Sequence, residues 1–169
     1  MRVRAFLCLV ARRIYCARAP INPFGGQHVP KEYRIAYLED RDQAALSIIG
    51  PGLHQFNMQA AGDNQYQPLC FALYADDETI VGGVVGATYW DWLYVDLLWI
   101  RDDLRGKGYG HRLLTCAEEE AQRRGAKNAY LDTFSFQAPA FYEQHGYEVF
   151  GELADFPPGH QRFFLRKQL

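Results

Sequence analysis

The sequence has few residues of the kinds that bind metals or form disulfides. Its four cysteines, at 8, 16, 70 and 116, include no C-x-x-C pair, and its five histidines make no H-E-x-x-H pattern. These absences exclude the common zinc motifs, so we expect no metal site. Unpaired cysteines fit a reducing compartment, and we expect a cytoplasmic protein.

Long apolar runs are also missing. A membrane-spanning helix needs about 20 consecutive apolar residues, whereas the run Ala5–Ala11 is broken at once by Arg12-Arg13. Residues 1–31 carry six basic residues, no acid and several prolines and glycines. We interpret 1–31 as an irregular extension, disordered or an upstream-start artefact, and we expect one domain over 32–169.

The balance of charge differs between these two parts. The whole chain has a net charge of -2, and setting aside the six basic residues of the extension leaves 12 basic against 20 acidic residues, or -8. An acidic domain disfavours nucleic acid and favours cationic substrates by electrostatic steering. We therefore expect neither nucleic acid nor membrane as a partner.

Alternating and helical patterns predict a mixed fold. Tyr33–Leu38 alternates as a strand, and Asp40 or Asp42 begins a helix that Gly50-Pro51-Gly52 ends near Ile49. The later elements expected are a helix Leu53–Ala61, strands Leu69–Ala75, Thr79–Trp90 and Trp92–Ile100, a helix from Gly110 to Gly125, a strand Asn128–Thr133, a helix Ala138–His145, and strands Tyr147–Leu153 and Arg162–Arg166. The fold class is α/β (α+β), a central mixed, mostly antiparallel twisted sheet flanked by helices.

A glycine-rich loop, Arg105–Gly110, lies between an expected strand and an expected helix. Main-chain N–H groups and the helix dipole can hold a phosphate at such a junction, and the basic side chains add positive charge. The loop is not a P-loop, because Gly108 stands where Ser or Thr must follow Lys107. It is not a dinucleotide fingerprint either, because its third glycine position falls on His111 or Leu113.

The loop resembles the R-x-x-G-x-G signature of the GNAT acetyltransferases, with Arg105, Gly108 and Gly110 at the matching positions. Downstream, Ala138–Tyr147 resembles the family's A-x-x-F-Y-x-x-x-G-F segment. The resemblance covers roughly Tyr33 to Lys167 and implies a GNAT-like fold, N-acetyltransferase activity and acetyl-CoA as the acetyl donor. Two positions depart from the pattern, since Ser135 replaces a common asparagine and Tyr147 replaces phenylalanine.

The resemblance also implies which residues contact the cofactor. The pantetheine arm is expected along the strand end, the pyrophosphate on the loop, and further contacts near the second motif. Tyr142 is expected as the general acid that gives a proton to the departing thiolate; a core tyrosine is the alternative. The expected cofactor-binding residues are Leu98, Trp99, Ile100, Arg105, Gly106, Lys107, Gly108, Tyr109, Gly110, Ser135, Ala138 and Tyr142.

Asp96 is the first candidate for the general base. It is the one acid inside the apolar run Trp92–Ile100, and strand alternation puts it on the same face as Leu98 and Ile100. An acid in that environment needs a reason, which is catalysis, substrate binding or structural pairing with an arginine. Asp91 and Glu39 are weaker candidates.

An aromatic cluster, Tyr89, Trp90, Trp92, Tyr94 and Trp99, can wall an acceptor pocket or form a sheet core. Because side chains alternate along a strand, we expect at most half of them to line a pocket. We expect the loop Asp155–His160 to close over it. The substrate-binding candidates are Tyr89, Trp90, Asp91, Asp96 and His160.

The predicted function is direct transfer of the acetyl group from acetyl-CoA to a primary amine of a small molecule, such as an aminoglycoside antibiotic or a polyamine. A protein N-terminal or lysine acetyltransferase is the alternative enzyme, and a non-catalytic acyl-CoA-binding module is an alternative of another class. A homodimer is left open.

Overall fold

The computed structural model describes residues 33–38 and 43–169, and residues 43–169 belong to one compact unit. Segment 33–38 is irregular, and its large side chains are exposed, with Ile35 fully so. The expected strand Tyr33–Leu38 is therefore wrong, because alternation alone makes no strand without a neighbour to receive its hydrogen bonds. The extension 1–31 and its boundary lie outside the described residues and stay predictions.

Helix α1 spans Gln43–Ala61 without interruption and contains Pro51. The expected break at Gly50-Pro51-Gly52 is wrong. Proline inside a helix costs about 3 kcal/mol, but the residues on both sides of Pro51 belong to one helix. No helix in the described part of the chain combines the length and apolar character needed to cross a membrane.

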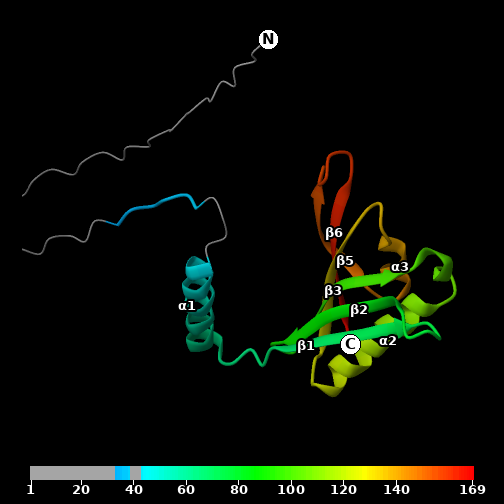
Figure 1. Ribbon diagram of the computed structural model, residues 1–169. Helices are drawn as coiled ribbons and strands as arrows, with labels where there is room; N and C mark the ends of the chain where they lie inside the picture. The colour runs from blue at the N-terminus through cyan, green and yellow to red at the C-terminus, as the bar shows by residue number, and fades with distance from the viewer. Residues whose placement is uncertain (1–32, 39–42) are drawn as a thin grey trace, which may run out of the picture. The chain divides into compact units, whose positions relative to one another are not determined.

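Six strands form one sheet in the order β1-β2-β3-β4-β6-β5 (Figure 1). Only β3 and β4 pair in parallel, and the other neighbours are antiparallel. This confirms the predicted mixed, mostly antiparallel sheet. The strands are β1 (Gln67–Tyr74), β2 (Ile80–Tyr89), β3 (Trp92–Ile100), β4 (Asn128–Phe134), β5 (Glu148–Ala154) and β6 (Gln161–Gln168).

Helices α2 (Tyr109–Arg123) and α3 (Pro139–Gln144) contribute to the core on one face of the sheet. The apolar stripe of α2 comprises Leu113, Leu114, Ala117 and Ala121, all buried against the strands, as its helical spacing predicted. Along β4 buried and half-buried residues alternate, so this sheet has one packed face and one more open face.

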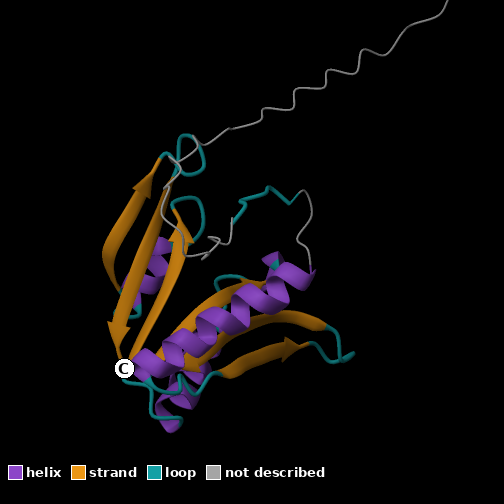
Figure 2. Cartoon of the chain, turned by 90° about the vertical axis from the view of Figure 1, so that its left-hand side faces the viewer, coloured by secondary structure: helices purple, strands orange, loops and turns teal. Residues whose placement is uncertain are grey.

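The sheet separates between β3 and β4. The two strands pair only over Trp92–Val95 and Asn128–Leu131. Beyond these residues the strands fall into two diverging groups (Figure 2). The edge of β3 that faces β4 thus has no strand partner over Asp96–Ile100 among the described residues, and its main-chain groups are available to a ligand.

A β-bulge lies at the start of this opening. The register between β2 and β3 shifts so that Val85 pairs with Leu97 and Gly86 with Val95, which leaves Asp96 as the extra residue. The bulge changes the phase of β3, and Leu98 and Ile100 pack against the same core as Val95. Asp96 instead shares the open face with Tyr94, so the expectation that it lies on the Leu98 and Ile100 face is wrong.

Gly86 allows the bulge, and Gly86→Ala tests it. An added Cβ would fall on the carbonyl oxygen of Tyr94, so we expect a lower Tm and a loss of about 1–3 kcal/mol in the free energy of unfolding. Gly151→Ala is the matched control, because it lies beside the register shift of β5 and its Cβ would meet Phe164 at an ordinary 3.8 Å. Equal thermal melts of the two variants would show that Gly86 is not required.

Candidate functional site

The loop after β3 requires glycine at two positions for backbone reasons. Gly106 has φ 72° and Gly108 has φ 81°, in the left-handed region that L side chains rarely adopt. An added Cβ would meet no atom within 4 Å at either position. The conformation therefore needs glycine, and the space above it is open to a ligand.

The N-terminus of α2 has free main-chain donors. Gly108 is its N-cap without a capping side chain, and the first helical bond runs from the Arg112 N–H to the Gly108 carbonyl, 3.1 Å. The N–H groups of Tyr109, Gly110 and His111 have no main-chain acceptor among the described residues. Together with the helix dipole, they form a cradle that can hold a pyrophosphate.

Arg105 connects this cradle to the end of β3. Its Nε donates to the carbonyl of Ile100 at 3.1 Å, and its guanidinium forms an exposed ion pair with Asp102 at 2.7 Å. The free edge of Leu98, Trp99 and Ile100 therefore leads directly into the cradle. An extended chain bearing amide groups can pair with such an edge as an added strand.

Tyr142 lies on α3 and is buried, with 8% of its surface exposed. Burial, with a further contribution from the charge of Asp132, raises the pKa of Tyr142 to about 12. Its hydroxyl has no hydrogen-bond partner in the described part of the chain. At neutral pH the group is a protonated donor without a competing acceptor, as a general acid requires.

The start of α2 and the helix that carries Tyr142 are in contact. A Cβ on Gly110 would lie 3.5 Å from the Phe141 ring, and His111 Nδ1 is 2.5 Å from His145 Nε2. Ala138 is the N-cap of α3. The fold thus brings both sequence motifs together, as the resemblance implied.

Ser135 and His160 lie together at the end of β4. Ser135 Oγ accepts a hydrogen bond from the Gln161 N–H at 3.2 Å and lies 3.5 Å from His160 Nδ1. The His160 ring packs edge-on against Phe136, with centroids 4.9 Å apart. His160 lines neither of the two cavities beside β3, so the structure does not bring it together with the other substrate-binding candidates.

A cavity of about 560 Å³ lies on the open face beside the bulge. Tyr89, Trp90 and Tyr94 all line it, which is more than half of the aromatic cluster. The expectation of at most half is wrong, because Trp90 belongs to the turn between β2 and β3, with φ 43°, and does not follow strand alternation. The lining residues are Asn57, Asn64, Tyr66, Pro68, Leu69, Cys70, Val85, Gly86, Ala87, Tyr89, Trp90, Tyr94 and Asp96.

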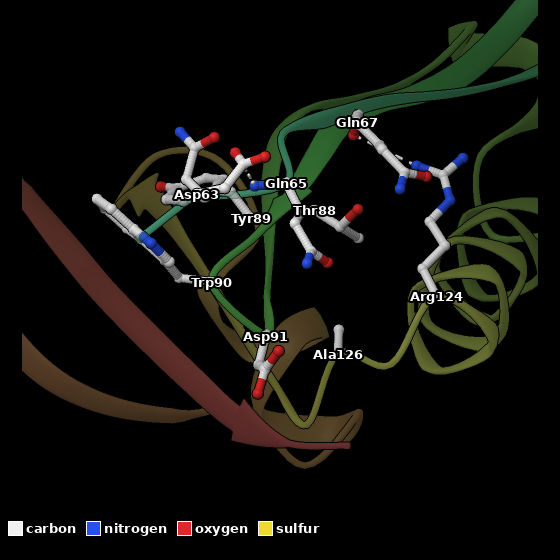
Figure 3. A pocket seen from close by; sticks show the side chains of 10 residues that line it. Asp63, Gln65, Gln67, Thr88, Tyr89, Trp90, Asp91, Arg124 and Ala126 are labelled. Atoms are coloured by element: carbon white, nitrogen blue, oxygen red, sulfur yellow. Dashed lines mark hydrogen bonds between the residues drawn. The ribbon is translucent and has the colours of Figure 1, made fainter. Parts of the chain in front are cut away.

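A second, smaller cavity of about 230 Å³ lies at the start of β3 and shares Asn64, Tyr89 and Trp90 with the larger one (Figure 3). Its walls are largely polar and include Thr88, Gln65 and Asp91, with Arg124 reaching in from the end of α2. The Asp91 carboxylate pairs with Lys127 at 2.9 Å. Asp91 therefore lines a different cavity from Asp96. Glu39, the other alternative base, lies outside the described residues.

Asp96 is exposed, and its one side-chain partner within the described ranges is the Tyr94 hydroxyl, which donates to its Oδ1 at 3.2 Å. Among the described residues no arginine pairs with it. The alternative explanation for Asp96, structural pairing with an arginine, is therefore wrong for the described residues. Its carboxylate can accept a proton or bind a cation.

Two charged residues near the opening were missed from the sequence. Asp132 follows the last β4 residue that pairs with β3, and Arg162 Nε donates to its Oδ2 at 2.7 Å. Asp132 is an acid inside the strand Asn128–Phe134, as Asp96 is inside β3, but this pattern alone does not indicate that the residue lies at the opening.

Comparison with known proteins identifies the family. Residues 29–147 match the model of the GNAT acetyltransferase family. The chain is 35% identical over 127 residues to acetyltransferase Atu2258 of Agrobacterium fabrum, covering 75% of this chain and 93% of that protein. It is 41% identical over 102 residues to the blasticidin-S acetyltransferase of Streptomyces morookaense, covering 59% and 75% respectively.

The fold agrees with these matches. A crystal structure of an acetyltransferase from Bacillus cereus superposes with a TM-score of 0.73 at 33% identity, covering 79% of this chain and 98% of that chain. The predicted family, enzyme class and cofactor are confirmed. The two sequence motifs also meet at one opening of the sheet. The chain belongs to the GNAT family of acetyltransferases, and acetyl-CoA is its acetyl donor.

Proposed function

We propose that the enzyme acetylates a primary amine of a small molecule bound in the larger cavity. One observation carries this proposal: Asp96 both lines that cavity and begins the unpaired edge of β3. An acceptor in the cavity and a cofactor on the edge would therefore meet at one carboxylate. Reaction between bound partners needs such proximity.

The cofactor is proposed to lie along the opening between β3 and β4. Its pantetheine arm would pair with Leu98, Trp99 and Ile100, and its pyrophosphate would rest on Arg105–Gly110. One β3 N–H would donate to the thioester oxygen, which gains negative charge during attack. Ser135 and Ala138 are proposed to contact the cofactor near Tyr142.

The chemistry follows from the groups at this opening. Asp96 would take one proton from the acceptor ammonium, and the free amine would attack the thioester carbon. Collapse of the tetrahedral intermediate breaks the C–S bond, and Tyr142 gives its proton to the thiolate. Tyr142 is then reprotonated by the second proton that leaves the acylated nitrogen, so both protons are accounted for.

A small acceptor is supported by the cavity and by a relative. A volume of about 560 Å³ falls in the range of small-molecule sites, and Tyr89, Trp90 and Tyr94 can contact a ring or a cation. The relative from Streptomyces morookaense is named for the antibiotic blasticidin S. We therefore place an amine-bearing antibiotic first and a polyamine second.

Release of CoA thiol across a panel of amines tests this proposal. The panel contains blasticidin S, an aminoglycoside, spermidine, and peptides with a free N-terminus or a lysine. We expect turnover with a small amine and a loss of roughly 100-fold in kcat/KM for Asp96→Asn, without a change in the Kd of acetyl-CoA. Turnover confined to the peptides would contradict the small-molecule acceptor, and tight CoA binding without any turnover would contradict catalysis.

A further inference from the structure

We propose that Asp132, oriented by Arg162, holds the ammonium group of the acceptor beside Asp96 where β3 and β4 separate. This inference rests on the proposed function and adds a substrate-positioning residue to it. It implies that the preferred acceptor is an amine that is protonated in solution, and not a neutral nucleophile.

Strand register places the two carboxylates at matching positions. The last pair between the strands is Val95 with Leu131, and the next residue on each strand is Asp96 and Asp132 respectively. Leu131 and Thr133, the residues directly before and after Asp132, are both buried in the core. Because side chains alternate along a strand, Asp132 lies on the open face, as Asp96 does. Both acids therefore stand on one face, at the two sides of the opening.

Two tyrosines form the surface next to these acids. Tyr94 and Tyr130 pair across the strands one position before the last pair, and their rings stack with centroids 4.9 Å apart and planes at 22°. The Tyr94 hydroxyl also donates to Asp96. An ammonium group at the opening would thus lie between two carboxylates and beside an aromatic surface, which is a favourable setting for a cation.

Arg162 fixes the direction of Asp132. Its Nε donates to Asp132 Oδ2 at 2.7 Å. Its guanidinium carbon lies 5.4, 5.8 and 5.5 Å from the ring centroids of Phe134, Phe156 and Phe164. Three rings therefore restrict the arginine, which in turn restricts the carboxylate. Asp132 Oδ1 has no hydrogen-bond partner among the described residues and is free to accept one from a ligand.

The charge of Asp132 also reaches the tyrosines of the reaction centre. It adds to the effect of burial in raising the pKa of Tyr142. It contributes in the same direction to the raised pKa of Tyr94, after burial and Asp96. A cation held by Asp132 would therefore be close to both the proposed base and the proposed acid. Asp96 and Asp132 carry two negative charges and Arg162 carries one positive charge. The net negative charge of one is what the bound cation would neutralise.

The competing explanation is that the pair only fastens β4 to β6. A purely structural pair would affect every acceptor equally, whereas a charge that holds the substrate would affect only cationic ones. The test uses the full chain with two nucleophiles, spermidine or the best cationic amine of the panel, and hydroxylamine, which is uncharged at neutral pH. Uncatalysed acetylation of hydroxylamine is subtracted.

For Asp132→Asn we expect the KM of the cationic amine to rise by about 10- to 100-fold, because a charge-assisted hydrogen bond is lost. The KM of hydroxylamine and the Kd of acetyl-CoA should stay within about twofold. Asp132→Glu, which keeps the charge, should recover part of the loss. Glu148→Gln is the matched control, because it removes an ion pair with Arg166 of 2.9 Å between β5 and β6, and it should leave both KM values unchanged.

Equal losses with both nucleophiles, or an unchanged KM for the cationic amine, would overturn the assignment of Asp132. The assignment would also be overturned if Asp132→Glu raised the KM of the cationic amine as much as Asp132→Asn and both variants had a lower Tm. That result would show that the pair with Arg162 is purely structural. These outcomes are separate from failure of the proposed function, which would appear as absence of turnover in the wild-type enzyme.

Discussion

Tyr142→Phe is expected to lower kcat by about 100-fold or more, since general acid catalysis contributes on that scale. The Kd of acetyl-CoA should change little. The ring remains in the core and the lost hydroxyl has no partner among the described residues, so the free energy of unfolding should shift by no more than about 0.5 kcal/mol. Steady-state kinetics and a thermal melt separate these effects.

Tyr147→Phe is the matched control for this variant. Tyr147 is also buried, with 3% of its surface exposed, and its ring packs edge-on against Tyr142 at 5.9 Å. Its hydroxyl lies near Glu118 and takes no part in the proposed reaction. Wild-type turnover by Tyr142→Phe, or an equal fall in both variants, would contradict the assignment of Tyr142 as the acid.

The raised pKa of Tyr142 gives this prediction a pH dependence. The acid form is the active one, and it is lost only as the pH rises through a pKa of about 12. No fall in activity due to Tyr142 should therefore appear below about pH 11. A fall between pH 8 and 10 that disappears in Tyr142→Phe would contradict the pKa raised by burial.

Gly108→Ala is expected to raise the Kd of acetyl-CoA by about 10- to 100-fold. The residue is in the left-handed region with φ 81°, where a Cβ costs about 1 kcal/mol. The Cβ would also occupy the open space above the N-terminus of α2, where we place the pyrophosphate. Calorimetric titration with CoA measures the change directly.

Gly125→Ala controls for the backbone strain. Gly125 lies past the other end of α2 with φ 93°, and an added Cβ there also meets nothing within 4 Å. Both variants should lose a similar free energy of unfolding, but only Gly108→Ala should weaken CoA binding. Wild-type affinity for CoA in both variants would contradict the binding of the pyrophosphate at the N-terminus of α2.

Elements with strong local signals were predictable from the sequence. The strand Trp92–Ile100 has the predicted ends, and the turn between β1 and β2 falls at Asp76-Asp77-Glu78, between the predicted strands Leu69–Ala75 and Thr79–Trp90. The glycine loop and Tyr142 follow from short motifs whose geometry is set by neighbouring residues, namely a strand end, left-handed glycines and a helix start. These features need little information from distant parts of the chain.

Features that depend on pairing were not predictable. The bulge that moves Asp96 to the open face arises from the register with β2, and no local pattern in β3 signals it. Asp132 has the same sequence pattern as Asp96. Its importance depends on where β3 and β4 separate and on Arg162, which lies 30 residues away. Tyr33–Leu38 shows the opposite failure, because its alternation is real but it pairs with no strand in the described part of the chain.

The central claim is that the opening between β3 and β4 binds the cofactor and is the reaction centre. A crystal structure of the full chain with CoA tests it most directly. We predict the pyrophosphate on the N–H groups of Tyr109, Gly110 and His111, the pantetheine paired with the edge Leu98–Ile100, and the sulfur within reach of the Tyr142 hydroxyl. CoA bound elsewhere, with the β3 edge empty or the sulfur remote from Tyr142, would contradict the claim.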